Sequence, residues 1–339
     1  MKGDAMTPKL TRREMLAGTV ATATLAGAAQ AQTTPTAATP AAPAAVPSLR
    51  GKSILVTGSS TGFGHVGALL YARAGAKVIA SMRNVPRPEA ETLRRAARDE
   101  RLDLHVVEID VTDDEQVARG VAEAERIAGG ALDVLVNNAG IPYTGPVELQ
   151  DIAATQAMFD TNVIGFQRMH RAVLPAMRAR RSGVIFNVSS QLGRMMIPFG
   201  GMYAATKFAV EAMSEQLAYE LAPRGIEVVI IQPGGYPTQV WPNRIRVTRE
   251  LLDRTPDELE AGYPEFTLRD SALGGSTDPA DVPRAIAEII AMPAGSRPLR
   301  RPVHPGPKPH EAINAVSAQV QRAVLGRTPY AAWAEAVLG

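Results

Sequence analysis

The sequence predicts a doubly wound α/β fold on a parallel sheet, in a single domain with a C-terminal lid. From residue 51 onward, short β-branched runs alternate with helical segments of roughly a dozen residues, as in strands joined by crossover helices. Each run is apolar on consecutive positions, which is typical of strands covered on both faces. The first run leads into a glycine-rich turn. The expected strands span residues 53–57, 78–81, 104–109, 134–137, 184–188 and 227–231.

The first 31 residues predict an export signal of the twin-arginine type. The pair Arg12-Arg13 precedes a weakly apolar Ala/Thr/Gly stretch and an Ala-x-Ala site that ends at Ala31. The stretch is far shorter than the ~20 apolar residues of a spanning helix, so we expect no stable membrane insertion. The expected location is periplasmic, through twin-arginine export. A cytoplasmic location is the alternative if the signal does not function.

The remaining boundaries follow from composition. Residues 32–48 are rich in Pro, Ala and Thr and carry no charge, so they cannot offset the entropy cost of ordering and predict a disordered linker. The folded domain is expected at 51–305, with the lid at about 242–275, and a helical tail at 306–339.

Composition excludes several classes of function. The chain has 339 residues, 45% of them apolar and 21% charged, as in soluble globular proteins. The four basic and two acidic residues of the first 31 leave 32 of each sign in the remainder, which argues against a nucleic-acid partner. No cysteine is present, and the five histidines show no paired spacing. Disulfides and a cysteine nucleophile are therefore excluded, and no metal site is predicted.

The turn after the first expected strand predicts a dinucleotide site. It reads TGSSTGFG, with Gly58 for a tight turn and Gly62 and Gly64 for close approach of a diphosphate to the start of a helix. The spacing G-x-x-x-G-x-G differs from the generic dinucleotide fingerprint, but its place between a strand and a helix favours the functional interpretation. Parallel sheets of this Rossmann type bind ligands at the carboxyl ends of their strands.

The segment after the second expected strand predicts NADP rather than NAD. An NAD site places an acidic residue here to bind the ribose 2′-hydroxyl, whereas this sequence reads Ala80-Ser81-Met82-Arg83-Asn84. Arg83 offers a planar set of donors suited to a 2′-phosphate. A solvated loop arginine is the alternative interpretation.

A serine, a tyrosine and a lysine follow the fifth expected strand. Tyr203 and Lys207 are four residues apart in a helical stretch and so share one face, and Ser190 lies thirteen residues before Tyr203. A phenol with a pKa near ~10 is a poor base at neutral pH, and a nearby ammonium group brings that pKa closer to the working range. A serine hydroxyl can donate to a developing alkoxide. Each residue alone is more simply a packing, surface or capping residue; the combination is not.

Together with NNAG at 137–140, these motifs resemble the short-chain dehydrogenase/reductase family over residues 52–241. The resemblance makes Tyr203 the proton donor or acceptor and Ser190 the residue that holds the substrate oxygen. Lys207 then binds the nicotinamide ribose, and Asn162 supports a water relay to Lys207, although an asparagine in a helical stretch also simply marks a kink. The predicted cofactor contacts are Gly58, Ser60, Gly62, Gly64, Arg83, Asp110, Asn138, Tyr203, Lys207, Pro233, Gly234 and Thr238.

The resemblance also assigns roles to Asp110 and to the PGGYPT segment, and it implies association of copies. The resemblance makes Asp110 the acid that contacts adenine, but Asp110 could equally cap the following helix. Residues 233–238, PGGYPT, match the family's PGxxxT motif beside the carboxamide. Family members usually associate through the helices that bear the residues matching Asn162 and Tyr203, so the resemblance implies a homo-oligomer.

The loop between Ser190 and Tyr203 suggests an apolar substrate pocket with no fixed charge. Packing in the core or against a second subunit is an equal alternative for these side chains. Further along, Asp278-Pro279 is expected to open a helix that runs to Ala291, and residues 297–303 a short edge strand. The apolar residues expected around the pocket are Leu192, Met195, Met196, Ile197, Pro198, Phe199, Met202, Tyr143, Tyr236 and Trp241.

The predicted function is an NADP-dependent oxidoreductase that interconverts a carbonyl and an alcohol on a lipophilic small molecule. A non-catalytic nicotinamide-nucleotide-binding regulator or scaffold is the alternative, although such a protein would be expected to lose Ser190, Tyr203 or Lys207. A lyase or epimerase with a permanently bound nucleotide is a third hypothesis, and the glycine spacing counts against it.

Overall fold

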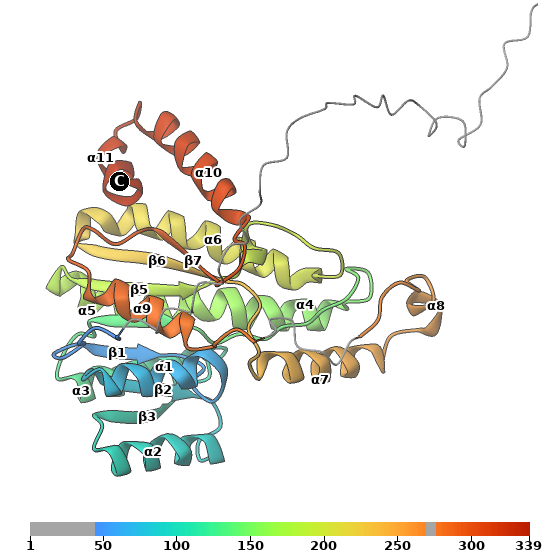
Figure 1. The fold of residues 1–339 in the computed structure, drawn as a ribbon, viewed down its shortest axis with the longest axis horizontal. Helices are drawn as coiled ribbons and strands as arrows, with labels where there is room; N and C mark the ends of the chain where they lie inside the picture. The colour runs from blue at the N-terminus through green and yellow to red at the C-terminus, as the bar shows by residue number, and fades with distance from the viewer. Residues whose placement is uncertain (1–44, 269–275) are drawn as a thin grey trace, which may run out of the picture. The chain divides into compact units, whose positions relative to one another are not determined.

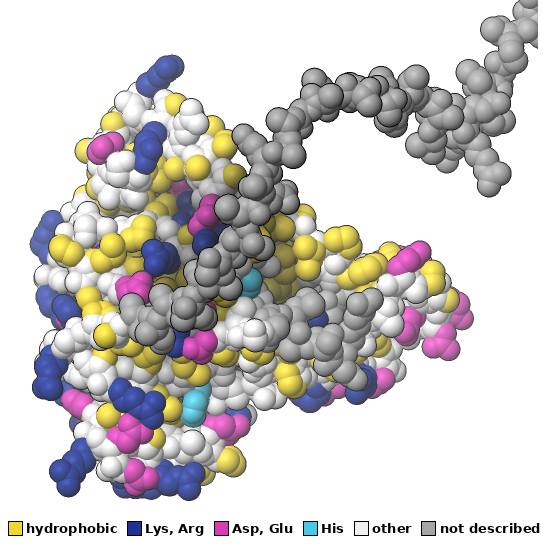
Figure 2. Space-filling view, viewed as in Figure 1, with side chains coloured by type: hydrophobic (Ala, Val, Ile, Leu, Met, Phe, Trp, Pro, Cys, Tyr) yellow, Lys and Arg dark blue, Asp and Glu magenta, His cyan; other side chains and the backbone are white. Residues whose placement is uncertain are grey.

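The structure is a computed structural model that describes residues 45–268 and 276–339. The expected signal at 1–31, the linker up to residue 44 and the lid residues 269–275 lie outside the described residues. Figure 2 shows basic and acidic side chains interspersed over the visible face, as the balanced charge of the sequence suggests. No helix in the described ranges is both long and apolar enough to cross a membrane.

A seven-stranded parallel sheet in the order β3-β2-β1-β4-β5-β6-β7 forms the centre of the domain (Figure 1). The doubly wound α/β fold predicted from the sequence is confirmed. The last strand pairs with β6 in the register Ile230↔Arg300, so the expected edge strand is present. The strands are β1 Ser53–Val56, β2 Lys77–Met82, β3 Leu104–Glu108, β4 Val134–Asn137, β5 Gly183–Val188, β6 Ile226–Pro233 and β7 Arg300–Val303.

Helices cover both faces of the sheet, which explains why its strands are apolar on consecutive positions. On β1, Ile54 and Val56 join the core under one helical layer, whereas Leu55 joins the core under the other. The first layer contains α1 Gly62–Arg73, α2 Pro88–Glu100 and α9 Asp281–Ala291. The second layer contains α3 Asp114–Ala128, α5 Gly165–Arg180 and α6 Gly201–Leu221.

The segment after β6 forms α7, Val240–Leu252, and the short α8, Asp257–Glu260, before the chain reaches α9 (Figure 1). The prediction that Asp278 and Pro279 open α9 was wrong, because the helix begins at Asp281. The Asp278 side chain accepts a hydrogen bond from the backbone N–H of Ala280, and its carbonyl accepts one from Asp281. These bonds close a tight turn that precedes the helix.

The C-terminal residues form α10, His310–Leu325, and α11, Ala331–Leu338. Val337 and Leu338 of α11 pack at the end of the core that also holds Leu221 of α6. Association of copies through the helices that bear Asn162 and Tyr203 stays a prediction.

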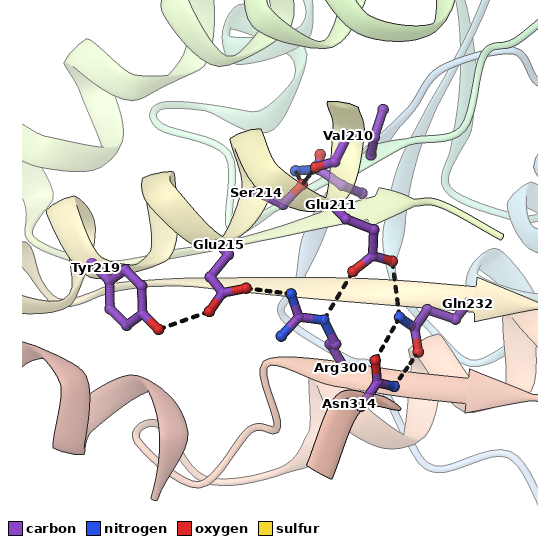
Figure 3. Close-up of polar contacts among 9 residues, drawn as sticks. Val210, Glu211, Ser214, Glu215, Tyr219, Gln232, Arg300 and Asn314 are labelled. Atoms are coloured by element: carbon purple, nitrogen blue, oxygen red, sulfur yellow. Dashed lines mark hydrogen bonds and ion pairs between the residues drawn. The ribbon is translucent and has the colours of Figure 1, made fainter. Parts of the chain in front are cut away.

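A buried group of charged and polar side chains ties α6 to β6, β7 and α10 (Figure 3). Arg300 of β7 donates from Nε to Glu211 at 2.8 Å and from a terminal nitrogen to Glu215. Glu211 also accepts from Gln232 at 2.9 Å. Gln232 in turn accepts from Asn314 of α10 at 2.7 Å. We call these residues the Arg300 network.

Candidate active site

The sequence-predicted site residues follow the carboxyl ends of neighbouring strands, where a parallel sheet places its ligand site. The glycine turn follows β1, Arg83 follows β2, and Asn138 follows β4. Ser190 follows β5, and Pro233 ends β6. The structure therefore brings the predicted cofactor and substrate residues to one edge of the sheet.

The glycine turn has no room for side chains at two of its positions. Gly58 has a φ of +67°, and a Cβ there would lie 2.8 Å from the Cα of Ala139. A Cβ on Gly64 would lie 2.5 Å from the carbonyl oxygen of Gly58 and 2.6 Å from the amide nitrogen of Asn138. Gly62 has a φ of +58°, which favours glycine for a conformational reason.

Asn138 holds this turn in place. Its side-chain amide donates to the carbonyl oxygens of Thr57 at 3.0 Å and Gly58 at 3.3 Å. Its backbone N–H donates to the Thr57 hydroxyl at 3.0 Å. Asn138 was predicted to lie beside the cofactor, and in the structure its hydrogen bonds shape the turn that would carry the diphosphate.

The start of α1 fits a nucleotide diphosphate. The N-cap residue Thr61 makes no side-chain cap, and no acidic residue lies in the first turn, so the N–H groups there are available to an anion. Ser60 lies beside them and is partly exposed. Thr238, from the PGGYPT segment after β6, faces the same turn, because a Cβ on Gly62 would lie 3.8 Å from its Cβ.

Arg83 and Asp110 lie together at the expected adenosine end. An Arg83 guanidinium nitrogen is 4.0 Å from a carboxylate oxygen of Asp110, and the Arg83 side chain is 56% exposed. Asp110 accepts from the backbone and hydroxyl of Thr112. Asp113, not Asp110, caps α3, so the capping alternative for Asp110 was wrong. The basic group after β2 is thus placed at the surface, beside Asp110.

Tyr203 lies in the first turn of α6, facing Ser190 at the end of β5. Burial raises the pKa of the Tyr203 phenol to about 12, whereas the Ser190 hydroxyl, which is hydrogen-bonded to it, and the nearby Arg244 guanidinium act to lower that pKa. Ser190 also accepts from the backbone N–H of Leu192 at 3.1 Å. The hydroxyl pair is therefore preassembled.

Lys207 lies one turn further along α6 and is 5% exposed. Its ammonium group donates to the carbonyl oxygen of Val188 at 2.8 Å and lies 5.6 Å from the centre of the Tyr203 ring. Burial lowers the pKa of Lys207 to about 8, and the Glu211 carboxylate acts in the opposite direction. The lysine is thus held as a cation beside the phenol below about pH 8.

Asn162 lies in a single π-helical turn, Asp160–Ile164, between α4 Ile152–Phe159 and α5. Its side chain accepts from the N–H of Ile141 at 2.8 Å and donates to the Ile141 carbonyl at 3.0 Å and to Thr206 at 3.1 Å. The Thr206 hydroxyl donates to the carbonyl of Tyr203 at 2.7 Å. Asn162 therefore connects the loop after β4 to the turn that bears Tyr203. π-Turns of this kind are frequent at functional sites. Its water relay stays a prediction.

Sequence reasoning missed Arg244 and the Arg300 network. Arg244 lies in α7, a segment after β6 for which the sequence predicted no regular element, so its inward face was not identified. The sequence could have indicated Glu211 as a buried neighbour of Lys207, because it lies four residues beyond Lys207 in α6 and side chains at this spacing share a face. Tyr236, expected at the pocket, is instead 2% exposed and packs between Phe63 and His304 with ring centres at 5.5 and 5.7 Å.

The arrangement can transfer a proton to or from a carbonyl oxygen. Ser190 and Tyr203 place two hydrogen-bonded hydroxyls together, which can serve one substrate oxygen. Stabilisation of a Tyr203 phenolate by Lys207 stays a prediction, because the contributions that lower the Tyr203 pKa come from Ser190 and Arg244. A nicotinamide nucleotide, when bound, accepts a hydride from the alcohol carbon or donates one to the carbonyl carbon. Within the described ranges, no three His, Asp or Glu side chains are grouped to hold a metal ion.

Residues 52–246 match the sequence model of the family described as short chain dehydrogenase. Retinol dehydrogenase 8 from Bos taurus is 35% identical over 279 residues, which cover 78% of this chain and 85% of the relative. A 3-ketodihydrosphingosine reductase from Bacteroides thetaiotaomicron is 34% identical over 254 residues, which cover 74% of this chain and 87% of the relative.

A solved structure of similar fold is a gluconate 5-dehydrogenase from Burkholderia cenocepacia J2315, in complex with NADP and tartrate. It is 33% identical with a TM-score of 0.54, and the match covers 57% of this chain and 74% of that one. The family match spans more than half of the chain, and the Ser190, Tyr203 and Lys207 site lies within it. The chain therefore belongs to the short-chain dehydrogenase/reductase family and is an oxidoreductase.

Proposed function

We propose that this protein is an NADP-dependent oxidoreductase that interconverts a carbonyl and an alcohol on a lipophilic small molecule. The observation that carries the proposal is the meeting of Ser190, Tyr203 and Lys207 beside the glycine turn. In oxidation, the hydroxyl proton would pass to Tyr203 in its phenolate form, and the carbinol carbon would give up a hydride that a bound nucleotide accepts; in reduction, the Tyr203 phenol would return the proton. The alcohol thus loses one hydride and one proton, which together carry two electrons and two protons.

Two observations support a lipophilic substrate. The loop between Ser190 and α6 exposes Met196 and Ile197, 70% and 41% exposed, and places Phe199 against Phe266 with ring centres 5.4 Å apart. Two relatives carry names with lipophilic substrates, retinol and 3-ketodihydrosphingosine. Screening purified protein with NADPH against medium-chain ketones and aldehydes tests this proposal. Binding of NADPH without turnover of any of them would favour the regulator or scaffold instead.

Preference for NADP is proposed to depend on Arg83. Replacing Arg83 with alanine is expected to lower kcat/KM for NADPH by about 10- to 100-fold, the range for a charged hydrogen-bonded pair with phosphate. The value for NADH should change by less than about threefold, because NADH has no 2′-phosphate to lose. Steady-state kinetics with both nucleotides measure this.

Arg87→Ala is the matched control, because Arg87 lies four residues on and is already paired with Glu89 at 2.8 Å. It should leave the NADPH-to-NADH ratio unchanged. Equal losses for both nucleotides in the Arg83 variant would contradict the proposed role.

For location, we propose export through the twin-arginine route with the nucleotide already bound. Support comes from the order of the arginine pair, the apolar stretch and Ala31 in the sequence. A nicotinamide pool is not expected outside the cytoplasm, so a working enzyme there would need its cofactor loaded before export. Nucleotide released by denaturing the periplasmic protein should be stoichiometric NADP(H). Uncleaved protein found in the cytoplasm would rule out this location.

A further inference from the structure

The inward face of α7 carries an arginine that lies beside the catalytic tyrosine. Thr248 of this helix is fully buried and accepts a hydrogen bond from the backbone N–H of Thr144, in the loop after β4. Arg244 precedes Thr248 by four residues and so lies on the same face. Thr144 in turn donates from its hydroxyl to the carbonyl of Phe199, in the loop before α6. Arg244 therefore lies on the side of α7 that faces these two loops.

The guanidinium of Arg244 is held from one side by an aromatic ring. Its central carbon lies 4.2 Å from the centre of the Trp241 ring, a cation–π distance. Trp241 is anchored by its indole N–H, which donates to the carbonyl of the buried Tyr236. One face of the guanidinium thus rests on a fixed surface, and its edge is left to bind a partner.

No carboxylate within the described ranges neutralises Arg244. Its Nε is buried without a hydrogen-bond partner there. Burial lowers the pKa of Arg244, and the opposing electrostatic contribution comes from Tyr203. Arg246, two residues on and on the outer face, is by contrast 61% exposed and paired with Glu250 at 2.7 Å. A buried donor with no partner is costly, so such a group is expected to be satisfied by a ligand.

We propose that Arg244 binds an acidic group of the substrate, so that the substrate is an oxo acid or hydroxy acid with an apolar chain. This inference rests on the proposed function. Ser190 and Tyr203 would hold the reacting oxygen, and Arg244, on the α7 face that contacts the loop after β4, would hold the acidic group of the same substrate. The planar donor edge of a guanidinium matches a carboxylate. The cofactor diphosphate is a weaker candidate partner, because the start of α1 already fits it.

The pocket then has two parts with different chemistry. Arg244 recognises the acid, and the exposed Met196 and Ile197 of the loop before α6 receive the apolar chain. The sequence predicted a pocket without fixed charge, whereas this proposal gives the pocket the charge of Arg244. A substrate with a charged end and an apolar body satisfies both parts.

The test compares acids with their methyl esters. The full chain with NADP+ is assayed on 2-hydroxyoctanoate, 3-hydroxyoctanoate and the two esters. We expect kcat/KM for at least one acid to exceed that for its ester by about 10- to 100-fold, the range for a charge-assisted hydrogen-bonded pair. Arg244→Met should abolish the preference, lowering kcat/KM for the acid by about 10- to 100-fold more than kcat/KM for its ester. Arg246→Met, the matched control, should keep the preference.

Binding of octanoate to the NADPH complex, measured by calorimetry, provides a readout that needs no turnover. Wild type and Arg246→Met should bind it, and Arg244→Met should not. Equal losses on acid and ester in Arg244→Met would overturn the inference and assign Arg244 to stabilising the Tyr203 phenolate. Weaker NADPH binding with an unchanged acid preference would overturn it in favour of a cofactor phosphate. Turnover of neutral ketones without octanoate binding would overturn it too, and leave the proposed function standing.

Discussion

Replacing Tyr203 with phenylalanine is expected to lower kcat by about 10²- to 10⁴-fold, the range supplied by a positioned acid–base group. In the wild type, the Lys207 ammonium group lies 5.6 Å from the centre of the Tyr203 ring. A phenylalanine ring would keep this position, so packing should change little. Only the hydroxyl that exchanges a proton with the substrate is lost. Affinity for NADPH should stay within about threefold, because the hydroxyl acts on the substrate oxygen. Single-turnover kinetics and fluorescence titration of NADPH measure the two effects.

Tyr219→Phe is the matched control, because Tyr219 lies on the same helix and its hydroxyl donates to Glu215 in the Arg300 network. It should keep kcat near the wild-type value. A Tyr203→Phe variant that keeps more than a tenth of the wild-type kcat would show that another group carries the proton. Loss of NADPH binding in that variant would instead indicate a structural role for the hydroxyl.

The fold and the centre of the site could be predicted because both depend on local patterns. Consecutive apolar residues such as Ile54, Leu55 and Val56 identify a strand covered on both faces, whatever packs against it. Tyr203 and Lys207 share a helix face because they are four residues apart. The strand ends then place Ser190 and the glycine turn beside them, since parallel strands end at one edge.

The remaining features depend on contacts between distant segments. Asp110 and Asp113 are both aspartates near the start of α3, so the sequence cannot tell which of them caps the helix. The structure identifies Asp113, because its side chain accepts hydrogen bonds from the backbone N–H groups of Glu115 and Gln116. The inward face of α7 is set by the contact of the buried Thr248 with Thr144 in the loop after β4, and Arg244 shares that face. An arginine in a lid is most simply a surface residue. The burial of its Nε, and the lack of a hydrogen-bond partner for that atom within the described ranges, are properties of the folded chain.

Replacing Arg300 with methionine is expected to destabilise the domain by about 3–5 kcal/mol, the cost of breaking a buried ion pair by removing one partner. Arg300 is 7% exposed and bonds to Glu211 and Glu215, which are themselves 2% and 10% exposed at the side chain. Without the guanidinium, two buried carboxylates would face each other one helical turn apart. Unfolding in urea, followed by circular dichroism, measures the loss.

The pH dependence separates charge from packing in that variant. An unpaired buried carboxyl group has a higher pKa in the folded protein than in the unfolded chain. The folded variant is therefore favoured at low pH and loses stability as the pH rises through the raised pKa. The deficit of Arg300→Met relative to wild type should therefore shrink as the pH is lowered from 7 toward 5. A deficit that is independent of pH would mean that the lost packing of the arginine stem dominates instead.

Two further variants locate the effect within the network. Arg301→Met changes the neighbouring residue of β7, which is 47% exposed and pairs with Glu288 at 3.2 Å, so it should cost no more than about 1 kcal/mol. Adding Glu211→Gln and Glu215→Gln to Arg300→Met removes the unpaired charges and should recover most of the lost stability. Glu211 lies one turn from Lys207 and raises the pKa of its ammonium group. The same triple variant should therefore lower that pKa and move the pH at which activity falls to a lower value. Recovery of stability without that shift would show that the network supports the fold and leaves the lysine untouched.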